Sequence, residues 1–167
     1  MSEADAPALR GWQQPGFKIR ATGVAIDRGR LLVHTVGTAP DWWALPGGGP
    51  EFQELSSETL AREMVEELGV TARVGRLLFV VERIFTTLNG IEAHHLDLSF
   101  EMSLDDEVRR RTEPWLGPSP EDYGSLLFHW HPLDTLGEAV PFYPAFMIEH
   151  LRGPLPQHPL HVAVRDG

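Results

Sequence analysis

The hydrophobic and polar positions of this chain change their period several times, and each change predicts a different element. Branched and aromatic residues in short runs predict strands, whereas apolar residues at every fourth position predict a helix. The expected strands and extended pieces are 17–26, 31–33, 42–45, 74–85, 94–102 and 126–130. We expect the turn at 27–30 to join the first two strands as a hairpin, and Asn89-Gly90 to form a second hairpin turn.

One stretch, from Ser57 to Leu68, has the helical period. Its regularly spaced apolar residues are Leu60, Met64 and Leu68. Gly69 stands where a left-handed residue would end the helix, and Ser56 or Ser57 can cap its start. The preceding Pro46-Gly47-Gly48-Gly49-Pro50 predicts a loop, because glycines permit close approaches that side chains would block.

The rest of the chain gives weaker signals. Residues 105–123 are charged, contain prolines and lack a period, which predicts a long surface loop. Residues 144–151 predict a helix with a proline in its first turn. At 167 residues the chain fits one domain. We expect an N-terminal arm over 1–16, the domain over 17–151 and an irregular C-terminal tail over 152–167.

Composition and charge narrow the classes of function. No apolar run approaches the roughly 20 residues of a membrane helix, and the N-terminus has neither the basic start nor the apolar stretch of a secretory signal. The absence of cysteine excludes disulfides and thiolate metal sites and agrees with a cytoplasmic location. The net charge of -10 argues against a nucleic-acid duplex as partner. An anionic substrate fits such a chain only with a divalent cation between carboxylates and phosphates.

The predicted helix carries three glutamates, Glu63, Glu66 and Glu67, on one face. Their spacing brings like charges together, which costs a bare helix roughly 0.2–0.5 kcal/mol per pair. A solvated helix side is the ordinary explanation. An oxygen-rich group of this kind also suits a hard cation such as Mg²⁺. Arg62 and Glu54 lie nearby, and an arginine can fix one carboxylate by a bidentate bond while others remain available to a metal ion.

The segment from Gly48 to Val70 reads GGPEFQELSSETLAREMVEELGV. It resembles the 23-residue Nudix box, G-x5-E-x7-R-E-U-x-E-E-x-G-U, at every fixed position. The matching residues are Gly48, Glu54, Arg62, Glu63, Met64, Glu66, Glu67, Gly69 and Val70. More loosely, residues 17–151 are similar to MutT-like members of this family.

The resemblance implies an α/β fold, the Nudix α/β/α sandwich with a mixed β-sheet and a loop-helix-loop catalytic motif. It also implies a pyrophosphohydrolase that uses Mg²⁺, or Mn²⁺ as a substitute, to cleave a diphosphate bond in a nucleoside diphosphate linked to another moiety. By this resemblance the metal ligands would be Glu63, Glu66, Glu67 and the carbonyl of Gly47. Arg62 and Glu54 would position the carboxylates, and Glu67 or Glu63 is the first choice for the general base.

Family members often draw a base or a further ligand from outside the box. The candidates here are Glu82, Asp97, Glu101, Asp105, Glu121 and Asp122, of which the first three are retained as possible auxiliary residues. Two positions depart from the family pattern. Gln53 stands where many members have glycine, which concerns the loop geometry. His95 stands where related members often carry glutamate, which would remove an auxiliary carboxylate or change the proton relay.

Further residues are candidates for contact with the substrate. Gly48 and Arg20 could meet its phosphates or ribose, and Trp43 could stack on a nucleobase. Adjacent strand residues face opposite ways, so at most one of Trp42 and Trp43 is expected to reach a site while the other packs. Core packing for the tryptophans and a plain surface position for Arg20 are the alternatives.

Two other classes of function are weighed beside the hydrolase. A non-catalytic Nudix-like nucleotide-binding regulatory module would be expected to lose box carboxylates, and all are present. An isomerase on the same fold would call for a catalytic cysteine, which this chain lacks. His129 and His131 share a spacing that can bind zinc, without an evident third ligand, and residues 105–123 are a candidate lid. The sequence leaves the substrate open, and family resemblance favours a homodimer.

Overall fold

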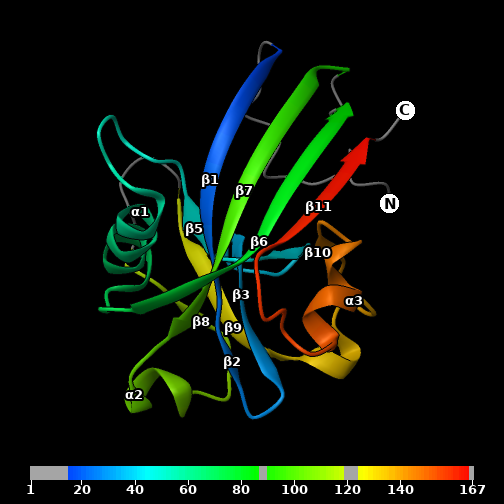
Figure 1. Ribbon diagram of the computed structural model, residues 1–167. Helices are drawn as coiled ribbons and strands as arrows, with labels where there is room; N and C mark the ends of the chain where they lie inside the picture. Colours follow the sequence, from blue (N-terminus) through cyan, green and yellow to red (C-terminus); the bar gives the residue numbers. More distant parts are fainter. Residues whose placement is uncertain (1–14, 87–89, 119–123, 166–167) are drawn as a thin grey trace.

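The computed structural model describes residues 15–86, 90–118 and 124–165, and two β-sheets form the body of the molecule (Figure 1). The strands of the first sheet are β1 (Gly16–Val24), β5 (Gly47–Gly48), β6 (Arg73–Thr86), β7 (Glu92–Ser103) and β11 (Leu160–Arg165). They lie in the order β11-β6-β7-β1-β5. β1 runs parallel to β7, whereas β6 runs antiparallel to it, so the predicted mixed sheet is confirmed.

The second sheet packs against the first. Its strands are β2 (Ile26–Asp27), β3 (Arg30–Val36), β4 (Trp43–Ala44), β8 (Trp115–Leu116), β9 (Leu126–Pro132) and β10 (Phe142–Tyr143). The order is β10-β4-β3-β9-β8, and β2 pairs with β3. The turn predicted at 27–30 therefore joins β2 to β3. A hairpin is therefore present at this turn, where Ile26 pairs with Leu31. Its first strand is shorter than expected, because most of 17–26 forms β1 and the chain passes from one sheet to the other between β1 and β2.

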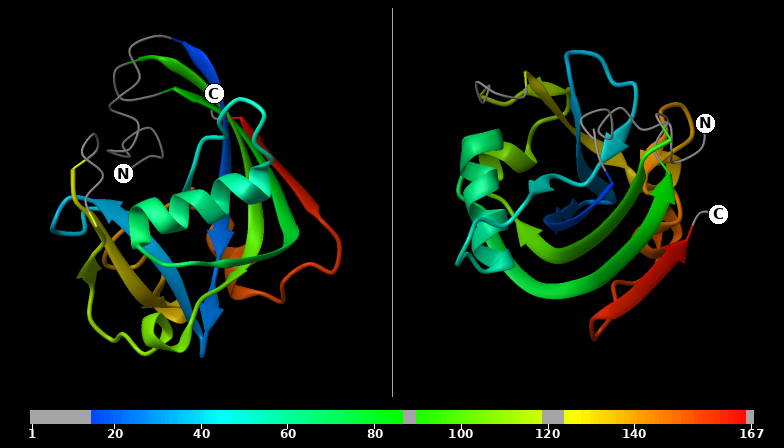
Figure 2. Two further views of the ribbon diagram at one scale, coloured as in Figure 1. Left: turned by 90° about the vertical axis from the view of Figure 1, so that its left-hand side faces the viewer. Right: turned by 90° about the horizontal axis from the view of Figure 1, so that it is seen from above.

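Helices lie on opposite sides of the paired sheets, with α1 on one side and α3 on the other (Figures 1 and 2). The helical elements are α1 (Ser56–Glu63), the π-helical turn η3 (Met64–Leu68), α2 (Asp106–Arg109), the 3-10 turn η4 (Leu133–Thr135) and α3 (Met147–Arg152). Leu60 and Met64 are fully buried and share a core cluster with Phe128 and Trp130 of β9. The apolar side of the predicted helix is thus the side that packs, and its acidic side is left for the site.

The helix predicted at 57–68 is present, but its start differs from the prediction. Ser56 is already helical, Leu55 occupies the cap position, and no side chain caps the helix. Instead, the carboxylate of Glu58 accepts a hydrogen bond from the Leu55 backbone N–H at 2.9 Å. The helix ends as predicted at Gly69, which has a left-handed φ of 73°. Its last turn has the wider π-helical winding, which is common at functional sites.

Two segments expected to be irregular contain regular structure. Within 105–123 the chain forms α2 and β8, and Trp115 stacks on Phe128 with ring centroids 6.0 Å apart. Within the predicted irregular tail, β11 pairs in parallel with β6. In β11 half-buried Val162 and Val164 alternate with exposed residues, a short strand pattern that the neighbouring prolines obscured.

The remaining differences concern boundaries. The C-terminal helix expected over 144–151 begins only at Met147, so Pro144 precedes it and does not lie in its first turn. Asn89, Glu121, Asp122 and most of the N-terminal arm lie outside the described residues. The division of the chain into arm, domain and tail stays a prediction.

Candidate active site

A cavity of about 940 Å³ opens between the box helix and the inner face of the first sheet. Its walls come from elements far apart in sequence: β1, β3, the glycine-rich loop, α1 with η3, β6 and β7. The predicted site residues that line it are Arg20, Gly47, Gly48, Arg62, Glu63, Glu66, Glu67 and Asp97. The fold thus gathers most of the predicted site around one cavity.

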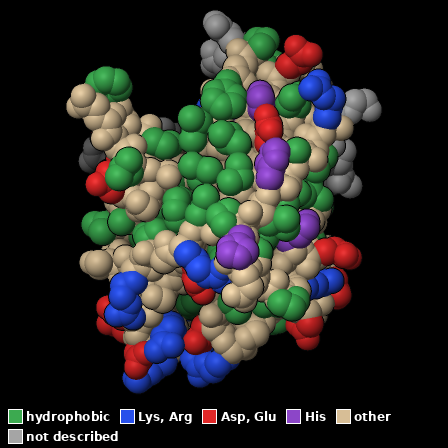
Figure 3. All heavy atoms as spheres, viewed as in Figure 1, with side chains coloured by type: hydrophobic (Ala, Val, Ile, Leu, Met, Phe, Trp, Pro, Cys, Tyr) green, Lys and Arg blue, Asp and Glu red, His purple; other side chains and the backbone are tan. Residues whose placement is uncertain are grey.

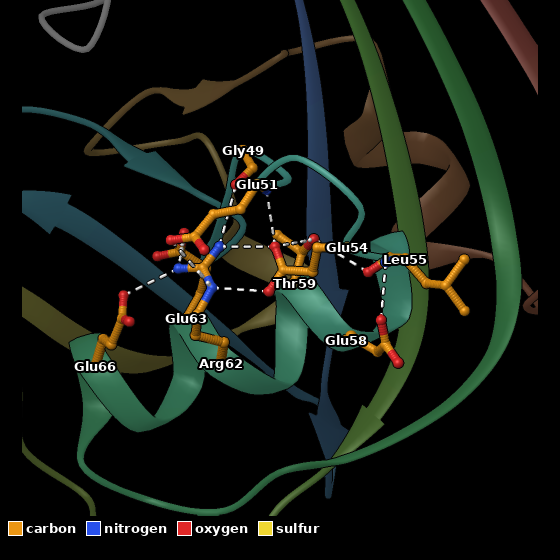
Figure 4. Close-up of polar contacts among 9 residues, drawn as sticks. All are labelled: Gly49, Glu51, Glu54, Leu55, Glu58, Thr59, Arg62, Glu63 and Glu66. Atoms are coloured by element: carbon orange, nitrogen blue, oxygen red, sulfur yellow. Dashed lines mark hydrogen bonds and ion pairs between the residues drawn. The ribbon is translucent and has the colours of Figure 1, made fainter.

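Arg62 organises the acidic side of this cavity (Figure 4). Its guanidinium donates two hydrogen bonds to Glu54, from Nε to Oε1 at 2.8 Å and from Nη2 to Oε2 at 3.0 Å. Nη1 donates to Glu63 and to Glu66, each at 3.0 Å, and Nη2 also reaches the Gly49 carbonyl at 3.2 Å. Because Arg62 donates to the Glu54 carboxylate, the pKa of Glu54 falls to about 2. Arg62 therefore fixes Glu54 as an ionised support for the helix and orients two further carboxylates.

The three box glutamates differ in exposure, although all line the cavity. The side chains of Glu63 and Glu67 are 14% exposed, whereas that of Glu66 is 52% exposed. Burial, and then the charge of Glu63, raise the pKa of Glu67 to about 8. Burial also raises the pKa of Glu63. Two buried carboxylates at one wall therefore hold their protons more tightly than exposed ones do.

Glu67 differs from the other two glutamates in the polar contacts of its carboxyl group. Its Oε2 is buried and makes no hydrogen bond within the described residues. The nearest basic group is His34, whose Nδ1 lies 4.0 Å away. Burial lowers the pKa of His34 to about 3, so this imidazole is neutral and supplies no counter-charge. The oxygen of Glu67 is thus available to a cation or a proton.

Two glycines bring the backbone close to these carboxylates. Gly47 pairs with Thr22 of β1 at a φ of 144°, and a Cβ there would lie 2.0 Å from the Ala21 carbonyl oxygen. At Gly48 a Cβ would lie 2.2 Å from the carboxylate of Glu63. The Gly47 carbonyl accepts a hydrogen bond from Arg20 at 3.2 Å. Glycine at these two positions therefore lets the loop backbone lie close to Glu63 and lets the Gly47 carbonyl contact Arg20.

The donor chemistry of this wall fits a divalent cation. In the part of the chain that the structure describes, no three acidic or histidine side chains converge as a ready metal site. Arg62 donates hydrogen bonds to Glu63 and Glu66, so these two carboxylates point toward its guanidinium and not toward a common metal position. Glu67 nevertheless has a buried oxygen without a hydrogen bond in the described residues, and Gly48 has no side chain between the backbone and Glu63. All of these donor atoms are oxygens, which are the hard ligands that Mg²⁺ prefers.

The inner face of the first sheet forms the polar floor of the cavity. Arg83 of β6 lies 3.8 Å from Asp97 and 3.4 Å from Nδ1 of His95, both on β7. Burial, followed by the charge of Arg83, lowers the pKa of His95 to about 3, so it is a neutral residue in a positive environment. The hydroxyls of Thr22 and Ser99 share a hydrogen bond of 2.8 Å.

Four predicted site residues do not line this cavity, and one of them, Glu54, still contacts the site through Arg62. Glu82 projects to the opposite face of the sheet, where His94 and His161 contact it at 2.9 and 3.3 Å. Histidine and acidic side chains beside a hydrophobic patch are visible on the outer surface of the molecule (Figure 3). Glu101 pairs with Arg76 at 3.2 Å. Strand alternation and distance along the strand therefore remove Glu82 and Glu101 from the site and leave Asp97.

Trp43 is the fourth of these residues. It is buried in the core and packs on His129 with ring centroids 5.7 Å apart, while its neighbour Trp42 lines the cavity. Trp42 is buried as well, in a core cluster with Phe85 and Tyr143. Of the two tryptophans only Trp42 borders the cavity, and a substrate contact by Trp43 stays a prediction that its position does not favour. His129 and His131 contact Trp43 and are not part of the cavity wall.

Several cavity residues had not been singled out from the sequence. These are Lys18, Thr22, His34, Arg83 and Ser99. Polar residues at every second position of β1, and of β7 opposite it, were the available signal. Which face they occupy depends on strand pairing, and that pairing is not visible in the alternation alone.

A mixed-sheet α/β fold with a carboxylate-bearing helix at the mouth of a cavity defines the class of protein, and comparisons with known proteins identify the family. The NUDIX domain model matches residues 17–149. Diphosphoinositol polyphosphate phosphohydrolase 2 from Rattus norvegicus is 37% identical over 76 residues, which cover 44% of this chain and 42% of that protein. The chain belongs to the NUDIX family.

Solved structures share this fold. A MutT protein from Bacillus halodurans superposes with a TM-score of 0.63 at 18% identity, covering 89% of each chain. A MutT NUDIX hydrolase from Burkholderia pseudomallei gives a TM-score of 0.55 at 22% identity, covering 80% of this chain and 97% of that one. The curated relative is matched over less than half its own length. Among the described residues, no helix has the length and apolar character needed to cross a membrane.

Proposed function

We propose that this chain is a pyrophosphohydrolase that cleaves a diphosphate bond in a nucleoside diphosphate linked to another moiety, with Mg²⁺ as cofactor and Mn²⁺ as a substitute. The observation that carries the proposal is the buried Glu67 carboxyl, whose Oε2 makes no hydrogen bond within the described residues and lies beside Glu63 at the cavity wall. Family membership supports it, because curated relatives that match part of this chain are named phosphohydrolases.

Glu63, Glu66, Glu67 and the Gly47 carbonyl would hold the cation. A cation bound there would polarise a phosphoryl oxygen and lower the pKa of a bound water. Arg62 keeps Glu54 ionised and aims Glu63 and Glu66 at the cavity. Its contribution is orientation, so that the carboxylates need not reorganise during the reaction.

Glu67 is the favoured general base, with Glu63 as the alternative. The proton of the attacking water would pass to Oε2 of Glu67, the buried oxygen that makes no hydrogen bond within the described residues. A carboxylate with a raised pKa holds such a proton better than an exposed one does, which improves its efficiency near neutral pH. Asp97, which lines the same cavity, is the auxiliary carboxylate that the geometry supports.

A panel of diphosphates assayed with Mg²⁺ and with Mn²⁺ tests this function. It contains sugar nucleotides, ADP-ribose, dinucleoside polyphosphates, nucleoside triphosphates and a diphosphoinositol polyphosphate, the last because relatives are named for it. Phosphate, pyrophosphate and nucleoside monophosphate are measured separately, so that the products name the bond that is cut.

Glutamine substitutions then test the residues. Glu66→Gln and Glu67→Gln are expected to remain folded and to lower metal-dependent turnover by about 100-fold or more. Glu149→Gln, an exposed glutamate on α3, is the matched control and is expected to keep full turnover. Full turnover in both box variants would overturn the metal assignment. Tight nucleotide binding without turnover of any compound would instead favour the non-catalytic regulatory module.

A further inference from the structure

His34 of β3 places one ring nitrogen beside the box carboxylate that lacks a hydrogen bond. Its Nδ1 lies 4.0 Å from Oε2 of Glu67, and both residues line the cavity. Both atoms are buried, and no described residue forms a hydrogen bond with either of them. Buried polar atoms are nearly always hydrogen-bonded, because leaving one without a partner is unfavourable. Two such atoms lying this close together therefore indicate a contact that the metal-free protein leaves open.

The imidazole of His34 is held in place by the rings around it. His34 is only 7% exposed. Its ring packs edge-on against Trp42, with centroids 6.3 Å apart, and lies 5.9 Å from the ring of Phe128. Glu67 has the longer side chain and lies on the last turn of the box helix, η3. A shift of about 1 Å by its carboxyl group would bring the two atoms within hydrogen-bond distance.

His34 and Glu67 are complementary in one arrangement when the carboxyl is ionised. Burial keeps the pKa of His34 near 3, so its ring is neutral and carries a single N–H. An ionised carboxyl can only accept hydrogen bonds, so the contact forms only if this hydrogen is on Nδ1. Each carboxylate oxygen has two lone pairs, and a bond from Nδ1 leaves one of them for a cation or a proton. The contact is therefore compatible with the part that Glu67 plays in the proposed function.

We propose that His34 is a positioning residue that donates a hydrogen bond from Nδ1 to Oε2 of ionised Glu67. This inference rests on the proposed function, because it assigns His34 to the support of a metal ligand. Arg62 donates such bonds to Glu63 and Glu66, and His34 supplies the corresponding bond to Glu67. Since the imidazole is neutral, Glu67 keeps its full negative charge for the cation. Loss of a hydrogen bond that orients a metal ligand typically weakens metal binding by about 10- to 100-fold.

Substitutions that move or remove the donor test this assignment through metal binding, without any turnover. The amide nitrogen of asparagine lies as many bonds from the backbone as Nδ1 of histidine, and that of glutamine lies as many bonds away as Nε2. Titration calorimetry with Mn²⁺ compares the unmodified chain with His34→Asn, His34→Gln and His34→Leu. We expect His34→Asn to bind Mn²⁺ within about threefold of the unmodified chain, and the other two variants to bind it about tenfold or more weakly.

His129→Leu is the matched control for these variants. His129 lies on β9, the neighbour of β3, but it packs on Trp43 and does not line the cavity. We expect its Mn²⁺ affinity to stay within about twofold of the unmodified chain, and thermal denaturation without metal identifies any variant that fails to fold. Unchanged affinity in every His34 variant would overturn the proposal. So would retained affinity in His34→Gln, or a loss in His34→Asn or His129→Leu as large as that in His34→Leu.

The position of the ring hydrogen is a direct test that requires no change at His34 in the protein under study. Nitrogen-15 NMR of histidine rings distinguishes a nitrogen that carries hydrogen from one that does not, and loss of signals in His34→Asn identifies those of His34. At pH 9 in EDTA, above the pKa of about 8 for Glu67, we expect the hydrogen on Nδ1, and we expect the same in excess Mg²⁺. A bare Nδ1 in either condition contradicts the proposal. If the unmodified chain binds neither Mn²⁺ nor Mg²⁺, the proposed metal site fails, and the metal-free spectrum alone decides the role of His34.

Discussion

At the scale of single residues, burying the carboxyl of Glu67 disfavours its ionised form in the metal-free protein. Burial removes water from a group that would otherwise ionise, and the charge of Glu63 adds to the effect. Arg62 offsets the repulsion for Glu63 and Glu66 by direct hydrogen bonds, whereas no such bond to Glu67 Oε2 occurs in the described residues. The burial that keeps this oxygen available to a cation or a proton therefore lowers the stability of the folded protein when Glu67 is ionised.

This effect of burial predicts a pH-dependent stability difference. The pKa of Glu67 rises from 4.5 to about 8 on folding, so both states hold the proton below pH 4.5. As the pH rises toward 8 the unfolded state loses its proton first, and the native state loses stability. We expect Glu67→Gln to raise the free energy of unfolding without metal by on the order of 1–3 kcal/mol at pH 8.5, and to leave it unchanged near pH 4.

Urea denaturation in EDTA across this pH range measures the difference. Glu149→Gln, which changes an exposed glutamate, is the control and should show no pH trend. A stabilisation by Glu67→Gln that is the same at every pH would refute the burial argument, because packing alone does not depend on protonation.

At the scale of elements, the glycine-rich loop and the box helix act as one unit. The loop brings the Gly48 backbone against Glu63, and Arg62 bonds back to the Gly49 carbonyl. The π-helical turn η3 then carries Glu66 and Glu67 to the cavity. At the other end of this unit, a Cβ at Gly117 after β8 would lie 2.0 Å from the Glu67 carbonyl oxygen. The segment expected to be a surface loop therefore packs against the turn that carries Glu67.

Adding a methyl group to this loop is predicted to damage metal binding at one glycine and not at its neighbour. In Gly48→Ala the new Cβ would lie 2.2 Å from Glu63 Oε1, so the flexible carboxylate must move away. In Gly49→Ala the nearest contact outside the adjoining residues is 3.7 Å, an ordinary packing distance. We expect about 10- to 100-fold weaker Mn²⁺ binding for Gly48→Ala, and a change within about twofold for Gly49→Ala.

Titration calorimetry with Mn²⁺ measures this contrast, and thermal denaturation without metal verifies that both variants fold. Equal loss of affinity in the two variants would show that loop stiffness, and not the position of Glu63, controls the site.

At the scale of the whole molecule, β11 protects an edge of the first sheet. It pairs in parallel with β6 from Leu160 to Arg165, and His161 reaches across to Glu82. The half-buried Val162 packs against the core cluster that contains Phe79 and Val81 of β6. The C-terminal strand therefore stabilises the sheet that carries the floor of the cavity, without lining the cavity itself.

Removal of residues 160–167 is predicted to lower stability and to cause self-association. An exposed strand edge presents unpaired backbone groups that recruit other chains. We expect the free energy of unfolding to fall by about 2 kcal/mol, the scale of burying one aliphatic side chain. Turnover per folded molecule should persist. Urea denaturation and size-exclusion chromatography measure these effects, with His161→Asn as a control that keeps the strand. A truncated chain that stays monomeric and equally stable would contradict this role for β11.

The chemistry that lies within one short segment could be predicted from the amino-acid sequence alone. Gly48, Glu54, Arg62 and the three box glutamates are separated by local spacings, so a loop and one helix suffice to bring them together. The helix end at Gly69 also followed from local pattern, whereas the mixed-sheet class followed from the family resemblance alone.

Which distant residues share the cavity depends on how the strands pair and the sheets pack. A shift of one residue in strand pairing would exchange the two faces of the sheet, so alternation could not say that Asp97 and Arg83 face the cavity while Glu82 faces outward. Trp42 and not Trp43 borders the cavity for a similar reason, because Trp43 packs into the core cluster that contains Leu151 of α3. Local spacing is a property of the chain, whereas register and sheet packing arise only when segments distant in sequence meet.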